Sequence, residues 1–189
     1  SRYVQLRDRL RREPNATRDR GTILHQWLAE IEWLPDGMPS DARLKELAEP
    51  HAESVNVHEL LGQFKNLLEL EEVRDVLVPE QFRSDFEKQF GASNGELQFE
   101  VRNEQRVAGR DGKNIITGTV DRLVLVRSNS GDLVAAEIID YKTDSTENRD
   151  EAADERRRDR HELQIAAYRR AICASLRLDR VATRLVYLP

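Results

Sequence analysis

The sequence has almost no cysteine and no long apolar run, and each shortage excludes a class of protein. Cys173 is the only cysteine in 189 residues, which excludes an internal disulfide and an iron–sulfur cluster held by cysteines. No run approaches the roughly 18 apolar residues of a membrane span, and no signal-peptide pattern opens the chain. A lone cysteine within an apolar helical pattern is typical of a small core residue, and a reducing, cytoplasmic location fits it.

Charge sets a further limit on function. Charged residues make up 34% of the chain and hydrophobic residues 39%, with a formal net charge of -5. This balance indicates a globular protein and argues against one that coats nucleic acid by charge alone. It leaves open an enzyme that grips nucleic acid in one cleft. The chain begins at Ser1 without methionine, and we expect a single domain over 1–189 that is excised from a longer protein.

The first half of the chain is predicted to be mainly helical, over 15–90. Its first helix is expected over 15–34, where apolar residues recur at helical spacing, with Asn15 or Thr17 as the cap. A shorter helix is expected over 1–13. The string "GASNG" at 91–95 has turn composition and ends the helical part.

The second half, 96–189, is predicted to form a sheet with a core helix. Strands are expected over 96–109, 115–126, 133–143 and 181–189, with a helix over 161–178 and a mobile charged loop over 144–160. Short turns between the first three strands indicate an antiparallel meander. The fold class is therefore α/β: a mixed central sheet flanked by helices, with a helical insert N-terminal to the sheet.

The string "EIIDYKTD" at 137–144 carries the first candidate site residues. Strand side chains alternate between faces, so Asp140 and Lys142 point to one side and Tyr141 to the other. Such a carboxylate can hold a hard cation, while the lysine positions water or offsets charge on an anionic substrate. The alternative is an ion pair at a fraying strand end.

Asp121 strengthens the catalytic interpretation. The string "GTVDRLVLV" places it in a very apolar strand, where a lone carboxylate is costly unless it is paired or binds metal. Asp121 and Asp140 on adjacent strands can converge on one Mg²⁺, which prefers oxygen ligands. Alternatively, Asp121 pairs with Arg122 or lies at an exposed strand edge. Gly118 allows a close approach of ligand or backbone, or marks a bulge.

Two helical pairs complete the candidates. His25 lies four residues after Gly21, and Tyr168 four residues after Gln164, so each pair shares a helix face. Taken alone, each pair is most simply structural. The other histidines receive the same structural interpretation: His51, His58 and His161. Next to Gln164 lie four arginines that either contact phosphates or form a solvated face, namely Arg156, Arg157, Arg158 and Arg160.

Together these motifs resemble a known family. The order of Gly21-x-x-x-His25, "GTVDRL", "EIIDYKTD" and Gln164-x-x-x-Tyr168 is similar to the RecB-type nuclease domain of the PD-(D/E)XK superfamily. The likeness is greatest to the C-terminal nuclease domain of AddA and RecB helicase–nucleases. It implies a restriction-endonuclease-like core. The chain departs from the family pattern where His161 replaces the usual aromatic residue before the glutamine motif.

The resemblance implies a role for each matching residue. Metal ligands would be Asp121, Asp140, His25 and the backbone carbonyl of Tyr141. Lys142 would be the catalytic lysine that orients the attacking water. The site would be supported by Gln164 and Tyr168, which would also touch DNA, and Glu104 would have at most a supporting role.

The resemblance also implies a reaction and partners. The reaction would be Mg²⁺-dependent phosphodiester hydrolysis, with Mn²⁺ as a substitute and without an iron–sulfur cluster. The substrate would be single-stranded DNA during double-strand-break repair and recombination. No Walker A sequence occurs here, so a helicase motor would lie elsewhere in the longer chain or on a second helicase–nuclease subunit, with no membrane partner. The alternatives are an inactive DNA-binding scaffold of the same fold and a stand-alone phage or mobile-element exonuclease.

Overall fold

The structure, a computed structural model, describes residues 15–90, 96–111, 114–143 and 151–189. The expected helix over 1–13 and the turn at 91–95 lie outside these ranges. Ten α-helices and β-strands follow one another within them: α1 (Ala16–Ala29), α2 (Asp41–Ala48), α3 (Val57–Leu67), α4 (Glu71–Leu77), α5 (Pro79–Phe90), β1 (Gln98–Asp111), β2 (Asn114–Arg127), β3 (Leu133–Lys142), α6 (Glu151–Leu176) and β4 (Val181–Tyr187). Two short 3₁₀ helices, Leu34–Asp36 and Glu49–His51, flank α2. None of the helices in these ranges is long and apolar enough to cross a lipid bilayer.

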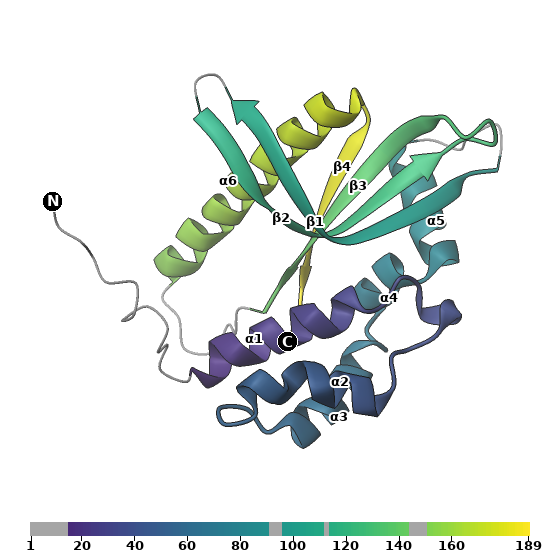
Figure 1. Ribbon diagram of the computed structural model, residues 1–189. Helices are drawn as coiled ribbons and strands as arrows, with labels where there is room; N and C mark the ends of the chain where they lie inside the picture. The colour runs from purple at the N-terminus through teal and green to yellow at the C-terminus, as the bar shows by residue number, and fades with distance from the viewer. Residues whose placement is uncertain (1–14, 91–95, 112–113, 144–150) are drawn as a thin grey trace, which may run out of the picture.

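The four strands form one mixed sheet in the order β1-β2-β3-β4. The first three pair antiparallel, and β4 pairs parallel to β3. A parallel pair needs a crossover, and α6 supplies it. The predicted meander and the returning fourth strand are therefore confirmed, as is the mixed α/β fold class (Figure 1).

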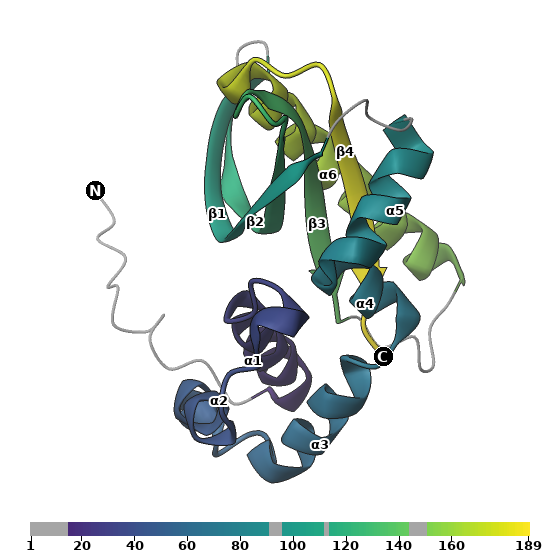
Figure 2. The same ribbon diagram turned by 90° about the vertical axis from the view of Figure 1, so that its right-hand side faces the viewer.

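Helices cover both faces of the sheet and give two cores (Figure 2). The helices α1 to α5, here called the helical layer, bury one face. Residues of the sheet that join this core include Val124, Val126, Ala135, Ile139 and Tyr141. The opposite face packs against α6 and includes Val120, Leu123, Leu125, Ala136 and Ile138. Along β3, odd and even residues alternate between the two cores, as a pleated strand requires.

Helix α1 begins where the sequence predicts and ends earlier. The side chain of Asn15 accepts a hydrogen bond from the backbone N–H of Arg18, which makes Asn15 the N-cap. The helix ends at Ala29, so the expectation of one helix to Leu34 was wrong over 30–33; Leu34 begins a short 3₁₀ helix, Leu34–Asp36. Ile31 is still fully buried, because the chain continues along the core in a non-helical path.

Helix α6 begins at Glu151, so the predicted loop over 144–160 was wrong from Glu151 onward. The segment "EAADERRRDR" is dense in charge, but Ala, Glu and Arg are strong helix formers and no Gly or Pro interrupts them. Helix propensity is therefore the stronger determinant of this segment than its charge density. The remainder, 144–150, lies outside the described residues, as do the side chains of Arg156, Arg157, Arg158 and Arg160.

The β1–β2 hairpin rotates near its middle, so that the strand face packed against one core before this turnover packs against the other core after it. Val124 packs against the helical layer and Val120 against α6, although strict alternation would place both on one face. Strand β1 changes face in the same region, between Val101 and Val107. Figure 1 shows the hairpin changing direction there.

The turnover occurs at the level of Glu104 and Asp121. Register places these residues opposite each other, between the pairs Asn103–Arg122 and Gln105–Val120. Glu104 has a φ of 49°, in the left-handed region that side chains with a β-carbon rarely adopt. This unfavourable backbone conformation rotates the strands, and two acidic residues lie at the point of rotation.

Candidate active site

The carboxylate of Asp121 lies where β2 and β3 separate. Their register ends at the pair Arg122–Ile139. Two residues further along β3, the amide N–H of Tyr141 donates to Asp121 Oδ2 at 2.8 Å. A side-chain carboxylate thus accepts the hydrogen bond that a main-chain carbonyl would accept in a continuing ladder. This fixes one carboxylate oxygen and leaves the other for a second partner.

That second partner is His25 of α1. Its Nδ1 lies 3.3 Å from Asp121 Oδ1, and its ring meets the edge of the Tyr141 ring at 6.2 Å between centroids. Burial by itself lowers the pKa of His25, but the hydrogen bond and charge of Asp121 raise it overall. The charges of Asp140 and Glu104 act in the same direction.

Glu104 of β1 adds a third side chain that can bind a metal ion. One ligand atom each from His25, Glu104 and Asp121 lies within 4.8 Å of the others. Burial, followed by the charge of Asp121, raises the pKa of the Glu104 carboxyl. Two carboxylate oxygens and one imidazole nitrogen fit a divalent cation: oxygen ligands suit Mg²⁺ and Mn²⁺, and imidazole is a good ligand for transition metals.

Asp140 and Lys142 lie at the end of β3, on the face that α6 covers. Lys142 Nζ forms an ion pair with Asp140 Oδ2, and the Asp140 side chain is only 8% exposed. Burial raises the pKa of Asp140; the bond to Lys142 opposes this shift, and the charge of Asp121 adds to it. Tyr141, between them, packs in the core of the helical layer, as strand alternation predicts.

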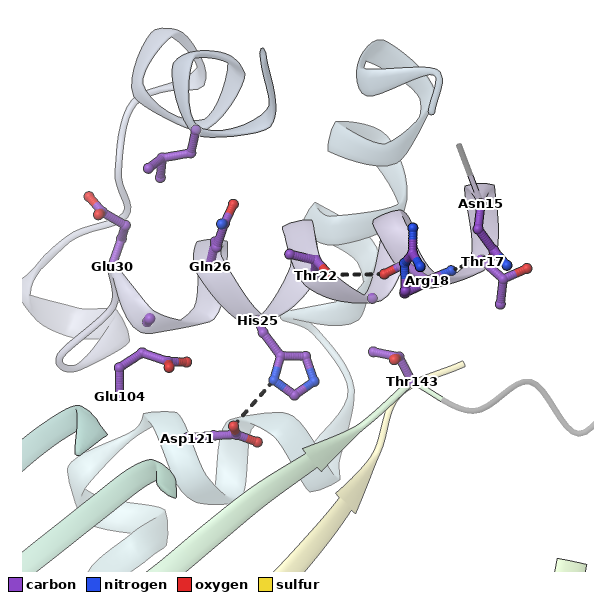
Figure 3. A pocket seen from close by; sticks show the side chains of 13 residues that line it. Asn15, Thr17, Arg18, Thr22, His25, Gln26, Glu30, Glu104, Asp121 and Thr143 are labelled. Atoms are coloured by element: carbon purple, nitrogen blue, oxygen red, sulfur yellow. Dashed lines mark hydrogen bonds and ion pairs between the residues drawn. The ribbon is translucent and has the colours of Figure 1, made fainter. Parts of the chain in front are cut away.

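A cavity of about 960 Å³ opens over the His25 side of these residues. Figure 3 shows His25, Glu104 and Asp121 converging beneath α1, with Thr143 beside them. The lining residues include the exposed side chains of α1 and of its two cap residues, namely Asn15, Thr17, Arg18, Thr22, Gln26 and Glu30. Asp140 and Lys142 are not among the residues that line this cavity, although the charge of Asp140 acts on His25 and that of Asp121 acts on Asp140.

The two glycines of the sequence motifs each make room for a neighbouring element. A β-carbon at Gly21 would lie 2.6 Å from Thr143 Oγ1, so only glycine lets α1 approach the end of β3 this closely. A β-carbon at Gly118 would overlap the phenol of Tyr168. Gly118 is therefore a site of close approach rather than a bulge.

Gln164 and Tyr168 belong to this second contact. Gln164 Nε2 donates to the Tyr168 hydroxyl at 3.0 Å, and Tyr168 is buried against Gly118, three residues before Asp121. Of the residues singled out from sequence, the structure groups His25, Asp121, Asp140, Tyr141 and Lys142 around the end of β3. It places Gln164 and Tyr168 one step away, supporting β2.

Sequence reasoning undervalued two residues. Glu104 had only a supporting role, but register places it opposite Asp121 and within the ligand group. A signal existed, since a carboxylate in the strand that pairs with "GTVDRL" lies opposite Asp121 once the hairpin pair Asp111–Asn114 fixes the register. Thr143, which packs on Gly21, had no local signal.

Comparison with known proteins identifies one family. A family model described as the PD-(D/E)XK nuclease superfamily matches residues 2–189. A search of the curated proteins finds no match. Nucleases of this superfamily use divalent metal ions, which agrees with the ligand group of His25, Glu104 and Asp121.

Proposed function

The chain belongs to the PD-(D/E)XK nuclease superfamily, and from this premise we propose that it is a metal-dependent deoxyribonuclease. The observation that carries the proposal is the convergence of three elements on one point. His25, Glu104 and Asp121 offer ligand atoms within 4.8 Å of one another, beside the buried pair of Asp140 and Lys142.

The metal would be held by Asp121, with His25 and Asp140, and the carbonyl of Tyr141 would complete the set. Glu104 joins this group because of its position opposite Asp121. Mg²⁺ is the proposed ion and Mn²⁺ a substitute. When bound, the ion would supply positive charge that polarises the scissile phosphate, and it would lower the pKa of a water molecule bound to it.

Side chains at the end of β3 would orient the attacking water. The ammonium of Lys142 lies at the end of β3 against Asp140, where it can donate hydrogen bonds to the attacking water and offset negative charge that develops on phosphate. Water adds to phosphorus and the bond to one sugar oxygen breaks. Asp140 keeps Lys142 in place, while Gln164 and Tyr168 hold β2 and contact DNA.

The exposed face of α1 suits the substrate. The cavity there is large enough for a strand of nucleic acid. Along α1 its wall carries uncharged polar side chains and Arg18, which contact a backbone without reading bases, and its acidic lining residues are Glu30 and the ligand-group members Glu104 and Asp121. We infer little direct base readout.

The finer biological role rests on the order and spacing of the four sequence motifs. It is an exonuclease of the RecB and AddA type in the cytoplasm. It cuts single-stranded DNA that a linked helicase delivers, with or without a second helicase–nuclease subunit, in double-strand-break processing and recombinational repair.

A cleavage assay tests the activity. Labelled single-stranded and duplex DNA would be incubated with Mg²⁺, Mn²⁺ or EDTA, and the parent compared with Lys142→Ala. Lys65→Ala is the matched control, because Lys65 of α3 forms an exposed ion pair with Asp41 of α2. We expect metal-dependent cutting by the parent and the control, and none by Lys142→Ala. Absence of cutting by the parent, even with Mn²⁺ and high enzyme, would contradict the proposal.

A further inference from the structure

Arg122 is a buried cation beside the ligand group. It is 0% exposed, and its guanidinium lies over the ring of Trp33 at 4.7 Å. Its Nη1 donates to the carbonyl of Ile31 at 3.0 Å and its Nη2 to the carbonyl of Glu32 at 2.6 Å. The sequence left open a pair between Arg122 and Asp121; instead, Arg122 reaches the chain that leaves α1.

Asn103 reaches the same stretch from β1. Its Nδ2 donates to the carbonyls of Ala29 and Ile31 at 2.8 Å and 3.0 Å. Its Oδ1 accepts from Arg122 Nη1 at 3.3 Å. The two side chains are cross-strand partners in the register, so they form one connected hydrogen-bond network between the hairpin and the end of α1.

This network binds backbone carbonyls at and just beyond the C-terminal end of α1. The last carbonyls of a helix have no partner within it, and a positive charge near that end is favourable. The last turn of α1 contains no basic residue. Asn103 supplies from the sheet a donor to the carbonyl of Ala29, the last helical residue, and Arg122 supplies a cation to the carbonyls of Ile31 and Glu32 just beyond it.

Stability alone is a poor explanation for such an arrangement. A guanidinium that is fully buried loses its hydration, and its hydrogen bonds here go to carbonyl and amide oxygens rather than to a carboxylate. Burial lowers the pKa of Arg122 accordingly. An apolar side chain in this core would avoid that cost. What Arg122 connects by its position therefore explains its presence better than a gain in stability does.

The positions of the two residues link all three ligand-bearing elements. Arg122 follows Asp121 on β2, and Asn103 precedes Glu104 on β1. Ala29, whose carbonyl Asn103 binds, lies one helical turn after His25 on α1.

We propose that Arg122 and Asn103 are positioning residues that hold α1 against the β1–β2 hairpin, so that His25 stays in reach of Asp121 and Glu104. They touch neither metal nor substrate. The inference rests on the proposed metal site. Outer partners of this kind hold ligands in place, and their loss typically lowers metal affinity by about 10-fold to 100-fold.

Asn103→Ala is the first test, because Asn103 is only partly buried and its loss spares the core. Mn²⁺ affinity would be measured by calorimetry in the parent, Asn103→Ala, His25→Ala and the double variant. We expect Asn103→Ala to bind Mn²⁺ about tenfold more weakly. In the His25→Ala background it should cost no further affinity, because the network acts through the position of that imidazole.

Arg184→Lys is the matched control. Arg184 is a second guanidinium on this sheet, partly rather than fully buried, and it binds Glu137 at 2.8 Å and Asp85 at 3.2 Å, away from the ligand group. It should lower the melting temperature and leave Mn²⁺ affinity unchanged. Arg122→Lys keeps the positive charge but loses the two guanidinium nitrogens that donate to separate carbonyls. It should weaken Mn²⁺ binding, as Asn103→Ala does.

The outcomes separate this inference from the proposed function. Equal Mn²⁺ affinity in Asn103→Ala and the parent, or an equal loss in Arg184→Lys, would overturn the positioning role even if the parent cuts DNA. An undiminished effect of Asn103→Ala in the His25→Ala background would overturn it too. A parent that binds Mn²⁺ but never cuts DNA, with the expected affinity pattern, would refute the nuclease activity and support the positioning role.

Discussion

Asp121 replaces a main-chain acceptor for Tyr141. Its carboxylate accepts the Tyr141 amide at 2.8 Å just beyond the last β2–β3 pair, so one side chain both completes the backbone hydrogen bonding of β3 and offers an oxygen to the ligand group. The two roles can be separated by substitution. The side-chain amide of asparagine can still accept the hydrogen bond from Tyr141, but it lacks the negative charge that favours metal binding.

Asp121→Asn and Asp121→Ala should therefore differ in stability but not in activity. Both should lose metal binding and cleavage. In EDTA, Asp121→Ala should be less stable than Asp121→Asn by about 1–3 kcal/mol, because it leaves the buried amide of Tyr141 without its acceptor. Urea denaturation measures this difference. Equal stability of the two variants would show that the hydrogen bond contributes little.

Lys142→Met should lower stability in a pH-dependent manner. Burial raises the folded-state pKa of Asp140, so its ionisation costs stability as pH rises through that pKa, and Lys142 offsets the cost. Without Lys142 we expect a loss on the order of 3 kcal/mol at neutral pH. The loss should shrink as pH falls toward 3.8, the ordinary pKa of an aspartate carboxyl.

A second substitution checks the cause of that loss. Asp140→Asn combined with Lys142→Met removes both charges and should recover most of the stability while remaining inactive. A pH-independent loss in the single variant would mean that packing, rather than the buried carboxylate, is responsible.

Metal binding should release protons. The pKa of Glu104 is raised above its ordinary 4.5 and that of His25 above its ordinary 6.5, while a metal binds only the unprotonated forms. Apparent affinity should therefore increase from about pH 6 to about pH 8. Calorimetry in two buffers of different ionisation enthalpy measures the protons released. Identical heats and a flat affinity would contradict the assignment of His25 as a ligand.

Glu104→Gly should be more stable than Glu104→Ala in the absence of metal. The usual order is the reverse, because glycine costs about 0.5–1 kcal/mol relative to alanine within a strand. At Glu104 the φ of 49° penalises any residue with a β-carbon by about 1–2 kcal/mol. Both variants should bind Mn²⁺ more weakly than the parent. Thermal unfolding in EDTA gives the order, and alanine above glycine would refute the left-handed conformation.

Gly118→Ala should lower both stability and activity, because the new methyl group overlaps the ring of Tyr168. Overpacking of this kind costs about 1–3 kcal/mol. Gly62→Ala is the control: Gly62 lies within α3, and nothing is within 4 Å of its added β-carbon, so it should gain up to about 1 kcal/mol. Unfolding of both variants under one condition makes the comparison. Neutrality of Gly118→Ala would show that Tyr168 moves freely.

Some features followed from the sequence because their causes are local. Alternation along a strand placed Asp140 and Lys142 on one face and Tyr141 on the other, and the short turns predicted the meander. The cap at Asn15 follows from a side chain that binds an amide three residues on. The error over 151–160 was also local, since charge was weighted above helix propensity.

The ligand group itself depends on tertiary structure. Asp121, Tyr141 and Lys142 are close in the sheet because β2 and β3 are neighbours, which the sequence predicts. The inclusion of Glu104 required the register of β1 and the rotation at its left-handed φ. The sequence determined which side chains could carry the chemistry, because residue type and strand period are written in it. Only the packing of α1 on the hairpin, through Arg122 and Asn103, decided that His25 meets Asp121, because those contacts join residues about 70 to 90 positions apart and no local pattern encodes them.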